Sequence, residues 1–324
     1  MDIKDLRPGD VLLFSGEKGS YISEAIMFLT DAPVSHAALA YEPSSSIVEE
    51  TPPAVQVNEA AARFPGRTIS VMRHTPAQPN YTPVLDAAKG YLNNEEPYGK
   101  SNLYLVGLLL IYRKFTPHTA LQRIIIKILK KVTASIINYF NEHKYPGKLP
   151  MVCSQFVYQC YEDAGPAYQL TIKGGVLGPT LMTAMPFPSL IDQAIARVRS
   201  DTTPAFRSFV GANVGLALTA PEAQSDEALA KELLEALHAA PTLALETAPA
   251  LQEALVVAIH EFGQAIQMVR TGAVPPIDEL AQANALRMAS TGIAQLKAEE
   301  AYFVSPGDLL LHCPSLALAG TIGG

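Results

Sequence analysis

Short apolar runs separated by turn residues fill the first quarter of the chain. Each run is short and is bounded by Gly, Pro, Asp or Ser, which is typical of β-strands. The runs lie at residues 10–14, 34–41, 47–49 and 68–73. The pattern therefore predicts four strands, with a short helix between the first two that Ser20 can cap.

The pattern changes to helical spacing after residue 103. Apolar side chains recur every three or four residues between residues 103 and 140, with lysines interleaved, which predicts a basic amphipathic hairpin. A further helix is predicted from Cys153 to Ala164, where Gly165 and Pro166 end it. Residues 225–272 and 277–297 are alanine-rich, acidic and helical in period, and residues 305–311 predict a turn and a last strand.

Charge is unevenly distributed along the chain. The net charge of −7 argues against a nucleic-acid binder, which needs a basic surface. Residues 111–150 hold only one acid, Glu142, against these bases: Arg113, Lys114, Arg123, Lys127, Lys130, Lys131, Lys144 and Lys148. One interpretation is a helical pair with solvated lysines. The other is a surface that lies on anionic lipid, with Lys127, Lys130 and Lys131 as candidate contacts.

The cysteine content and the chain start bear on the compartment. Three cysteines make no disulfide framework, so we expect free thiols and synthesis in a reducing compartment. The first residues lack the pattern of a secretory signal, which favours cytoplasmic synthesis, with peripheral membrane association or signal-independent export left open. The longest apolar run, residues 103–112, is about half the ~20 residues that a membrane-spanning helix needs.

Cys153 is the candidate nucleophile. It falls in the first turn of a predicted helix, where unpaired N–H groups and the helix dipole favour a thiolate. The same N–H groups are suited to bind the oxyanion of a tetrahedral intermediate. The alternative is a small buried apolar residue, the role that we assign to Cys160 and Cys313.

His36 is the candidate base because it interrupts an apolar strand, where a lone imidazole needs a hydrogen bond. A carboxylate is expected to orient the ring, and Glu49 and Glu50 lie on the next predicted strand. Strand alternation points these two side chains to opposite faces, so only one can serve. Each of these residues also has a purely structural interpretation.

Together these residues carry a family resemblance. Four segments, in this order, resemble the permuted papain-like enzymes of the NlpC-type superfamily, in particular the YiiX/YebB-like group that is related to lecithin:retinol acyltransferase. The segments are Leu6-Arg7-Pro8-Gly9-Asp10-Val11, Val34-Ser35-His36-Ala37, Ile47-Val48-Glu49 and Val152-Cys153-Ser154-Gln155-Phe156-Val157. Tyr98 resembles part of a short Tyr-Gly element of that family and is a candidate substrate contact.

The resemblance implies an α+β, circularly permuted papain-like fold and a division of the chain. Residues 1–199 would form the catalytic domain with a cationic insertion at about residues 101–148, residues 200–300 an acidic helical region, and residues 301–324 a closing segment. It also favours Glu49 over Glu50 as the third member of a Cys153–His36–Glu49 triad.

The function implied is a cysteine hydrolase or acyltransferase that works through a thioester. The expected substrate is a lipid or phospholipid acyl ester at a membrane surface, because a cationic apolar region precedes the nucleophile. A peptidoglycan or peptide amidase is the alternative, and a non-catalytic lipid- or partner-binding module is a third. No metal-ligand spacing or phosphate loop is present, so no cofactor is expected, and residues 200–300 are a candidate surface for a protein partner or inhibitor.

Overall fold

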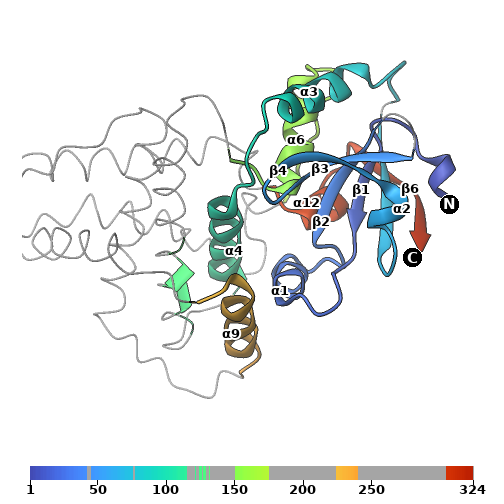
Figure 1. Ribbon diagram of the computed structural model, residues 1–324. Helices are drawn as coiled ribbons and strands as arrows, with labels where there is room; N and C mark the ends of the chain where they lie inside the picture. Colours follow the sequence, from blue (N-terminus) through green and yellow to red (C-terminus); the bar gives the residue numbers. More distant parts are fainter. Residues whose placement is uncertain are drawn as a thin grey trace, which may run out of the picture. The chain divides into compact units, whose positions relative to one another are not determined.

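The computed structural model describes residues 1–41, 45–75, 77–114, 121, 124–125, 127–128, 131, 150–174, 224–239 and 304–323. These residues form a mixed α+β structure with a six-stranded antiparallel sheet (Figure 1), which confirms the predicted class. The chain divides into two compact units. One comprises Met1–Asn102, Lys148–Pro179 and Glu300–Gly324, and the other Leu103–Gly147 and Thr180–Glu299. The predicted domain boundaries remain a prediction.

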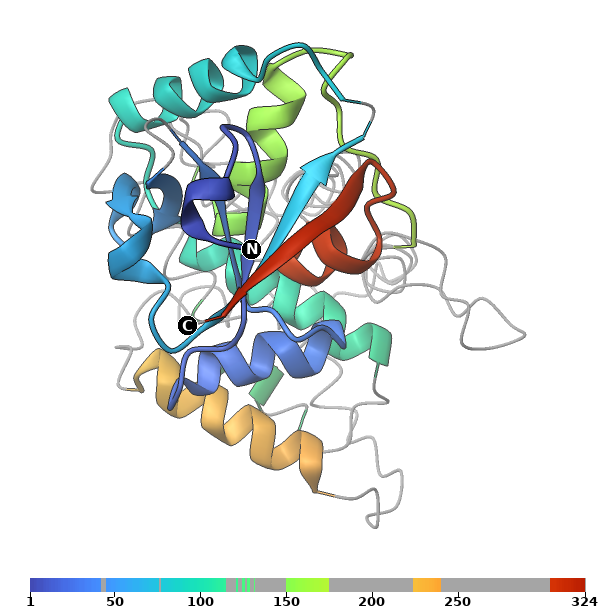
Figure 2. The same ribbon diagram turned by 90° about the vertical axis from the view of Figure 1, so that its right-hand side faces the viewer.

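The first unit is built on the sheet. Its strands are β1 (Val11–Phe14), β2 (His36–Ala40), β3 (Ser46–Thr51), β4 (Ala54–Glu59), β5 (Thr68–His74) and β6 (Leu316–Gly323). They lie in the order β4-β3-β2-β1-β5-β6, and every neighbouring pair is antiparallel. The last strand lies beside β5 (Figure 2), so it joins the N-terminal part of the chain across a large sequence separation.

Both faces of the central strands are covered, which explains why their sequences are apolar without alternation. Val11, Leu13 and Leu39 belong to a buried cluster on one face, and Leu12 and Phe14 to a second cluster on the other. All four residues of β1 are buried. A strand buried on both faces reads as a continuous apolar run.

Helices cover the two faces. The first cluster includes residues of α3 (Thr82–Asn93), α6 (Cys153–Asp163) and α12 (Pro306–Leu311). The second includes residues near the short helix α2 (Ala60–Arg63). Among its described residues this unit also contains α1 (Tyr21–Thr30) and a turn of 3-10 helix, η1 (Ile3–Asp5). As expected, the Ser20 side chain caps α1 by accepting a hydrogen bond from the amide of Ser23.

The second unit contains most of α4 (Lys100–Lys114) and all of α9 (Asp226–His238). Within it, Lys127 Nζ lies 2.7 Å from Glu232 Oε1, and Lys131 Nζ lies 2.9 Å from Asp226 Oδ1. Lys131 is buried, whereas Lys127 is exposed. Among the described residues, no helix is both long and apolar enough to cross a membrane.

The prediction of a strand at residues 305–311 is wrong, because α12 occupies them. Ser305 Oγ accepts from the amide of Asp308 at 3.1 Å, and Asp308 Oδ2 accepts from the amide of Ser305 at 2.9 Å. This reciprocal capping box, with Pro306 in the first turn, starts a helix. The closing strand is β6, which the sequence pattern did not indicate, and β4 and α3 were missed as elements as well.

Candidate active site

Cys153 is the first residue of α6, and Val152 occupies the N-cap position. The loop before it is fixed by residues that lie far earlier in the chain. The amide of Gly99 donates to the Met151 carbonyl at 2.5 Å, and Asn102 Nδ2 donates to the Pro150 carbonyl at 2.5 Å. A side chain at position 99 would place its Cβ 2.8 Å from the Pro150 carbonyl carbon, so glycine is required for this approach.

The thiol of Cys153 lies in a setting that favours its charged form. Burial acts to raise its pKa, but the charge of His36 and a hydrogen bond to that ring outweigh burial, so the pKa lies below its usual value. The amides of Ala37 and Ser154 also hydrogen-bond the sulfur. The pairing of β2 with β3 ends at Leu39–Val48, two residues after Ala37. The amide of Ala37 is therefore not used in that pairing and can bond the sulfur of Cys153.

His36 begins β2 and is mostly buried. Its Nε2 lies 2.5 Å from Glu49 Oε2, and the ring also hydrogen-bonds the side chain of Cys153. Because Nε2 faces the carboxylate, Nδ1 is the nitrogen left for the thiol. Burial opposes the charge of the ring, but Cys153 and then Glu49 overcome it and raise the pKa of His36 to about 9. The two shifts act in the same direction and favour a thiolate–imidazolium pair over a neutral thiol and imidazole.

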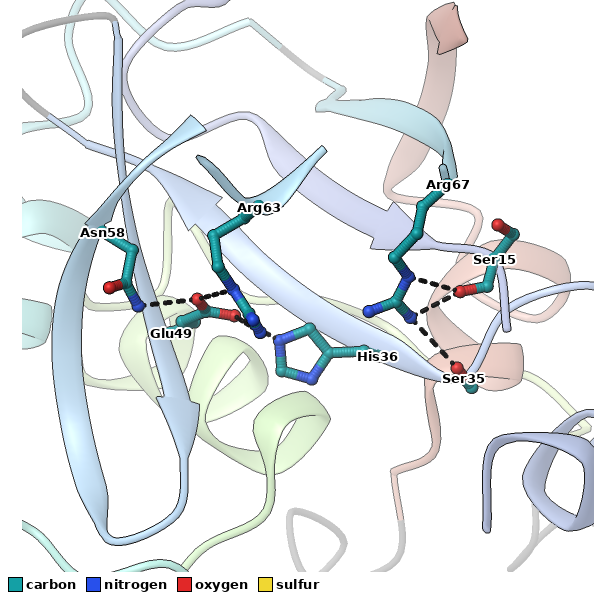
Figure 3. Close-up of polar contacts among 7 residues, drawn as sticks. All are labelled: Ser15, Ser35, His36, Glu49, Asn58, Arg63 and Arg67. Carbon is teal, nitrogen blue, oxygen red and sulfur yellow. Dashed lines mark hydrogen bonds and ion pairs between the residues drawn. The ribbon is translucent and has the colours of Figure 1, made fainter. Parts of the chain in front are cut away.

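Glu49 is fully buried on β3 and accepts hydrogen bonds at both oxygens (Figure 3). Besides His36, its partners are Asn58 Nδ2 at 2.8 Å and Arg63, whose Nε and Nη2 lie at 2.6 and 3.1 Å. Burial acts to raise the pKa of Glu49, but the bonds to His36 and Arg63 lower it to about 2. The carboxylate is therefore ionised at all physiological pH values and fixes the orientation of the imidazole.

Glu50, the competing acid, has a different environment. It is also fully buried, but its two carboxyl oxygens accept no hydrogen bond from the described residues. Burial, followed by the charges of Cys153 and Glu96, raises its pKa to about 9, so it is neutral at physiological pH. Of the two neighbouring acids, Glu49 is the one that hydrogen-bonds His36.

The structure brings Cys153, His36 and Glu49 together from a helix and two strands. Tyr98 is half-buried and pairs with Met151, two residues before the nucleophile. Lys127 and Lys131 belong to the second unit, where each has a carboxylate partner, and Lys130 lies outside the described residues.

Three further residues near the site were missed in the sequence. Gln56 faces Glu49 in the β3–β4 register, and alternation puts Asn58 on the same face, but the sequence alone indicated neither β4 nor this register. Arg63 follows in the next short helix, which carried no sequence signal that ties it to Glu49. Arg67 donates to the Ser15 carbonyl and to Ser35 Oγ (Figure 3), and its guanidinium contacts the Phe14 ring, which His36 also contacts.

The remaining two cysteines differ from Cys153. All three thiols are free, as predicted, but burial raises the pKa of both Cys160 and Cys313. Among the described residues, no group of three or more His, Cys, Asp or Glu side chains is placed to hold a metal ion.

Comparison of the chain with protein-family models, curated proteins and solved structures returned no match.

Proposed function

We propose that this protein is a cysteine-dependent acyl-bond hydrolase or acyltransferase, and that its fold is a permuted papain-like one. The observation that carries the proposal is the hydrogen-bonded series from the Cys153 thiol through His36 to a fully buried Glu49. A lowered thiol pKa, a raised imidazole pKa and an ionised orienting carboxylate are the three conditions that thiol catalysis needs. The order of a strand-borne histidine before a helix-borne cysteine supports the permuted fold.

The proposed reaction follows from these positions. The Cys153 thiolate attacks the acyl carbonyl carbon, and the negative charge that forms on the oxygen is stabilised by N–H groups at the start of α6. The C–O or C–N bond then breaks as His36 gives its proton to the leaving group, which leaves a thioester on Cys153. Water or an acceptor attacks the thioester, His36 takes up its proton, and the thiolate returns.

The substrate that we propose to test first is a lipid acyl ester, in keeping with the resemblance to the lecithin:retinol acyltransferase branch. Lys127 and Lys131 give little support to this choice, because their charges are balanced by Glu232 and Asp226. An amide of a peptide or of peptidoglycan uses the same thiol chemistry and is the competing substrate class.

The test is acylation and turnover in one experiment. Purified protein is incubated separately with phospholipid vesicles, with peptidoglycan fragments and with an activated nitrophenyl ester. The products are identified, and the mass of the intact protein is measured, by mass spectrometry. We expect an acyl adduct on Cys153 and a loss of turnover of about a thousandfold or more in Cys153→Ala. Equal turnover by the wild type and Cys153→Ala would refute the proposal, and so would the absence of any Cys153 adduct with the activated ester.

A further inference from the structure

The guanidinium of Arg67 is held by backbone and side-chain contacts, and it is close enough to Cys153 for the two groups to interact electrostatically. Its Nε donates to the Ser15 carbonyl at 2.8 Å, its Nη2 donates to the same oxygen, and Nη2 also lies 3.3 Å from Ser35 Oγ (Figure 3). Ser35 directly precedes His36 in the chain. The contacts therefore attach the guanidinium to the residue that precedes His36.

The ring of Phe14 contacts both Arg67 and His36. The Arg67 guanidinium carbon lies 5.1 Å from the centroid of the Phe14 ring, in a cation–π contact. The His36 and Phe14 rings form an edge-to-face pair with a centroid separation of 5.3 Å. Arg67 and His36 thus contact one side chain, and Arg67 is only half-buried, so that solutes can reach it.

Arg67 has no carboxylate partner among the ion pairs of the described residues, in contrast to Arg63 and Arg73. Two acids attract it electrostatically: Glu17, which is exposed, and Glu49, whose oxygens are taken by His36, Asn58 and Arg63. Taking a cation partly out of water without a counterion is costly. A bound anion would remove this cost.

The acids near Arg67 leave it able to bind an anion. Glu49 is bound to His36 and Arg63, and Glu17 is exposed and forms no ion pair with Arg67 among the described residues. Glu50 contributes no charge at neutral pH. The bonds of Arg67 to Ser15 and Ser35 use Nε and Nη2, so Nη1, which donates to none of the described residues, can donate to a ligand.

We propose that Arg67 forms a subsite for a carboxylate or phosphate group that the substrate carries close to its reacting carbonyl. This inference rests on the proposed function and narrows its substrate class to anionic acyl compounds. Arg67 would act as a specificity-determining residue, with Ser15, Ser35 and Phe14 holding it in place.

The test compares two alkylating reagents of nearly equal size, iodoacetate and iodoacetamide, of which only the first carries a charge. In both reactions the Cys153 thiolate forms a bond to the CH2 carbon as iodide leaves, so a change in thiolate content affects both rates equally. We expect the ratio of the iodoacetate rate to the iodoacetamide rate at Cys153 to fall about tenfold in Arg67→Gln, from the loss of one charge at close range.

Two variants make the result specific. Arg67→Lys keeps the charge and should retain most of the wild-type ratio. Arg7→Gln removes an exposed arginine of the same unit and should leave the ratio unchanged. An unchanged ratio in Arg67→Gln would overturn the proposal, as would a Cys153 that reacts with neither reagent in the wild type.

A second experiment separates the subsite from the enzymatic proposal and distinguishes the two anions. Hexanoyl esters of glycerol, glycerate and glycerol phosphate differ in charge near one acyl group and are short enough to stay dissolved as monomers. We expect Arg67→Gln to raise KM about tenfold or more for the charged esters and less than about twofold for the glycerol ester. If the alkylation ratio responds to Arg67→Gln but neither these esters nor the phospholipid and peptidoglycan substrates are turned over, the enzymatic proposal fails and the anion subsite stands.

Discussion

Glu50 makes the stability of this protein depend on pH in a way that one substitution should remove. Its side chain is fully buried, and both carboxyl oxygens lack a hydrogen bond from the described residues. Its pKa rises from 4.5 to about 9 on folding. Between these values the folded protein keeps a proton that the unfolded chain has released, so stability falls as the pH rises.

The magnitude follows from the number of protons. One proton difference changes the free energy of unfolding by about 1.4 kcal/mol per pH unit, which gives about 3 kcal/mol between about pH 6 and pH 8. The raised pKa of His36 and the lowered pKa of Cys153 have opposite effects over this range, because one group binds a proton where the other releases one. The lowered pKa of Glu49 stabilises the fold above about pH 4.5, and this contribution is lost only as the pH falls toward 2.

We therefore expect Glu50→Met to be more stable than the wild type by up to about 3 kcal/mol at neutral pH, because an apolar side chain of similar length needs no proton to be buried. The gain should grow from about pH 6 to pH 8. The assay is urea unfolding of both proteins at several pH values, with Glu24→Met, which replaces an exposed carboxylate on α1, as the control. Parallel pH profiles for wild type and Glu50→Met would refute the reasoning.

Three further predictions concern the site. Alkylation of Cys153 should begin at a lower pH than alkylation of an ordinary thiol, because its pKa is lowered, and His36→Ala should move that onset to higher pH; equal pH profiles for both proteins would contradict this. Glu49→Gln should lower turnover of an activated ester by about 10- to 100-fold and should lower the pKa of His36, because the substitution removes the carboxylate charge. NMR titration of the ring measures this pKa, and an unchanged titration would count against Glu49 as the residue that orients His36. Gly99→Ala should destabilise the fold by about 1–3 kcal/mol, because the added Cβ would lie 2.8 Å from the Pro150 backbone. Gly90→Ala in α3 adds a Cβ that meets nothing within 4 Å and should stabilise the fold by up to about 1 kcal/mol. Thermal unfolding of the two variants measures this, and a Gly99→Ala protein at least as stable as Gly90→Ala would contradict the close approach.

The sequence determined those features that depend on neighbouring residues. The apolar runs marked β1, β2, β3 and β5, and Gly165 with Pro166 marked the end of α6. Cys153 was predictable as the start of a helix, and His36 as a polar interruption of a strand, because both signals lie within a few residues.

Only the tertiary structure decided which of these residues meet. The choice between Glu49 and Glu50 depends on which of the two side chains lies on the same face of the sheet as the His36 side chain. This follows from the register between β2 and β3, which short apolar runs do not fix. Arg63 and Arg67 reach the site because β4 returns along β3 and the chain then continues into β5. At residues 305–311 the apolar triplet suggested a strand, but the capping box starts a helix there. The strand β6 is defined by its pairing with β5, a contact between distant residues that no local pattern encodes.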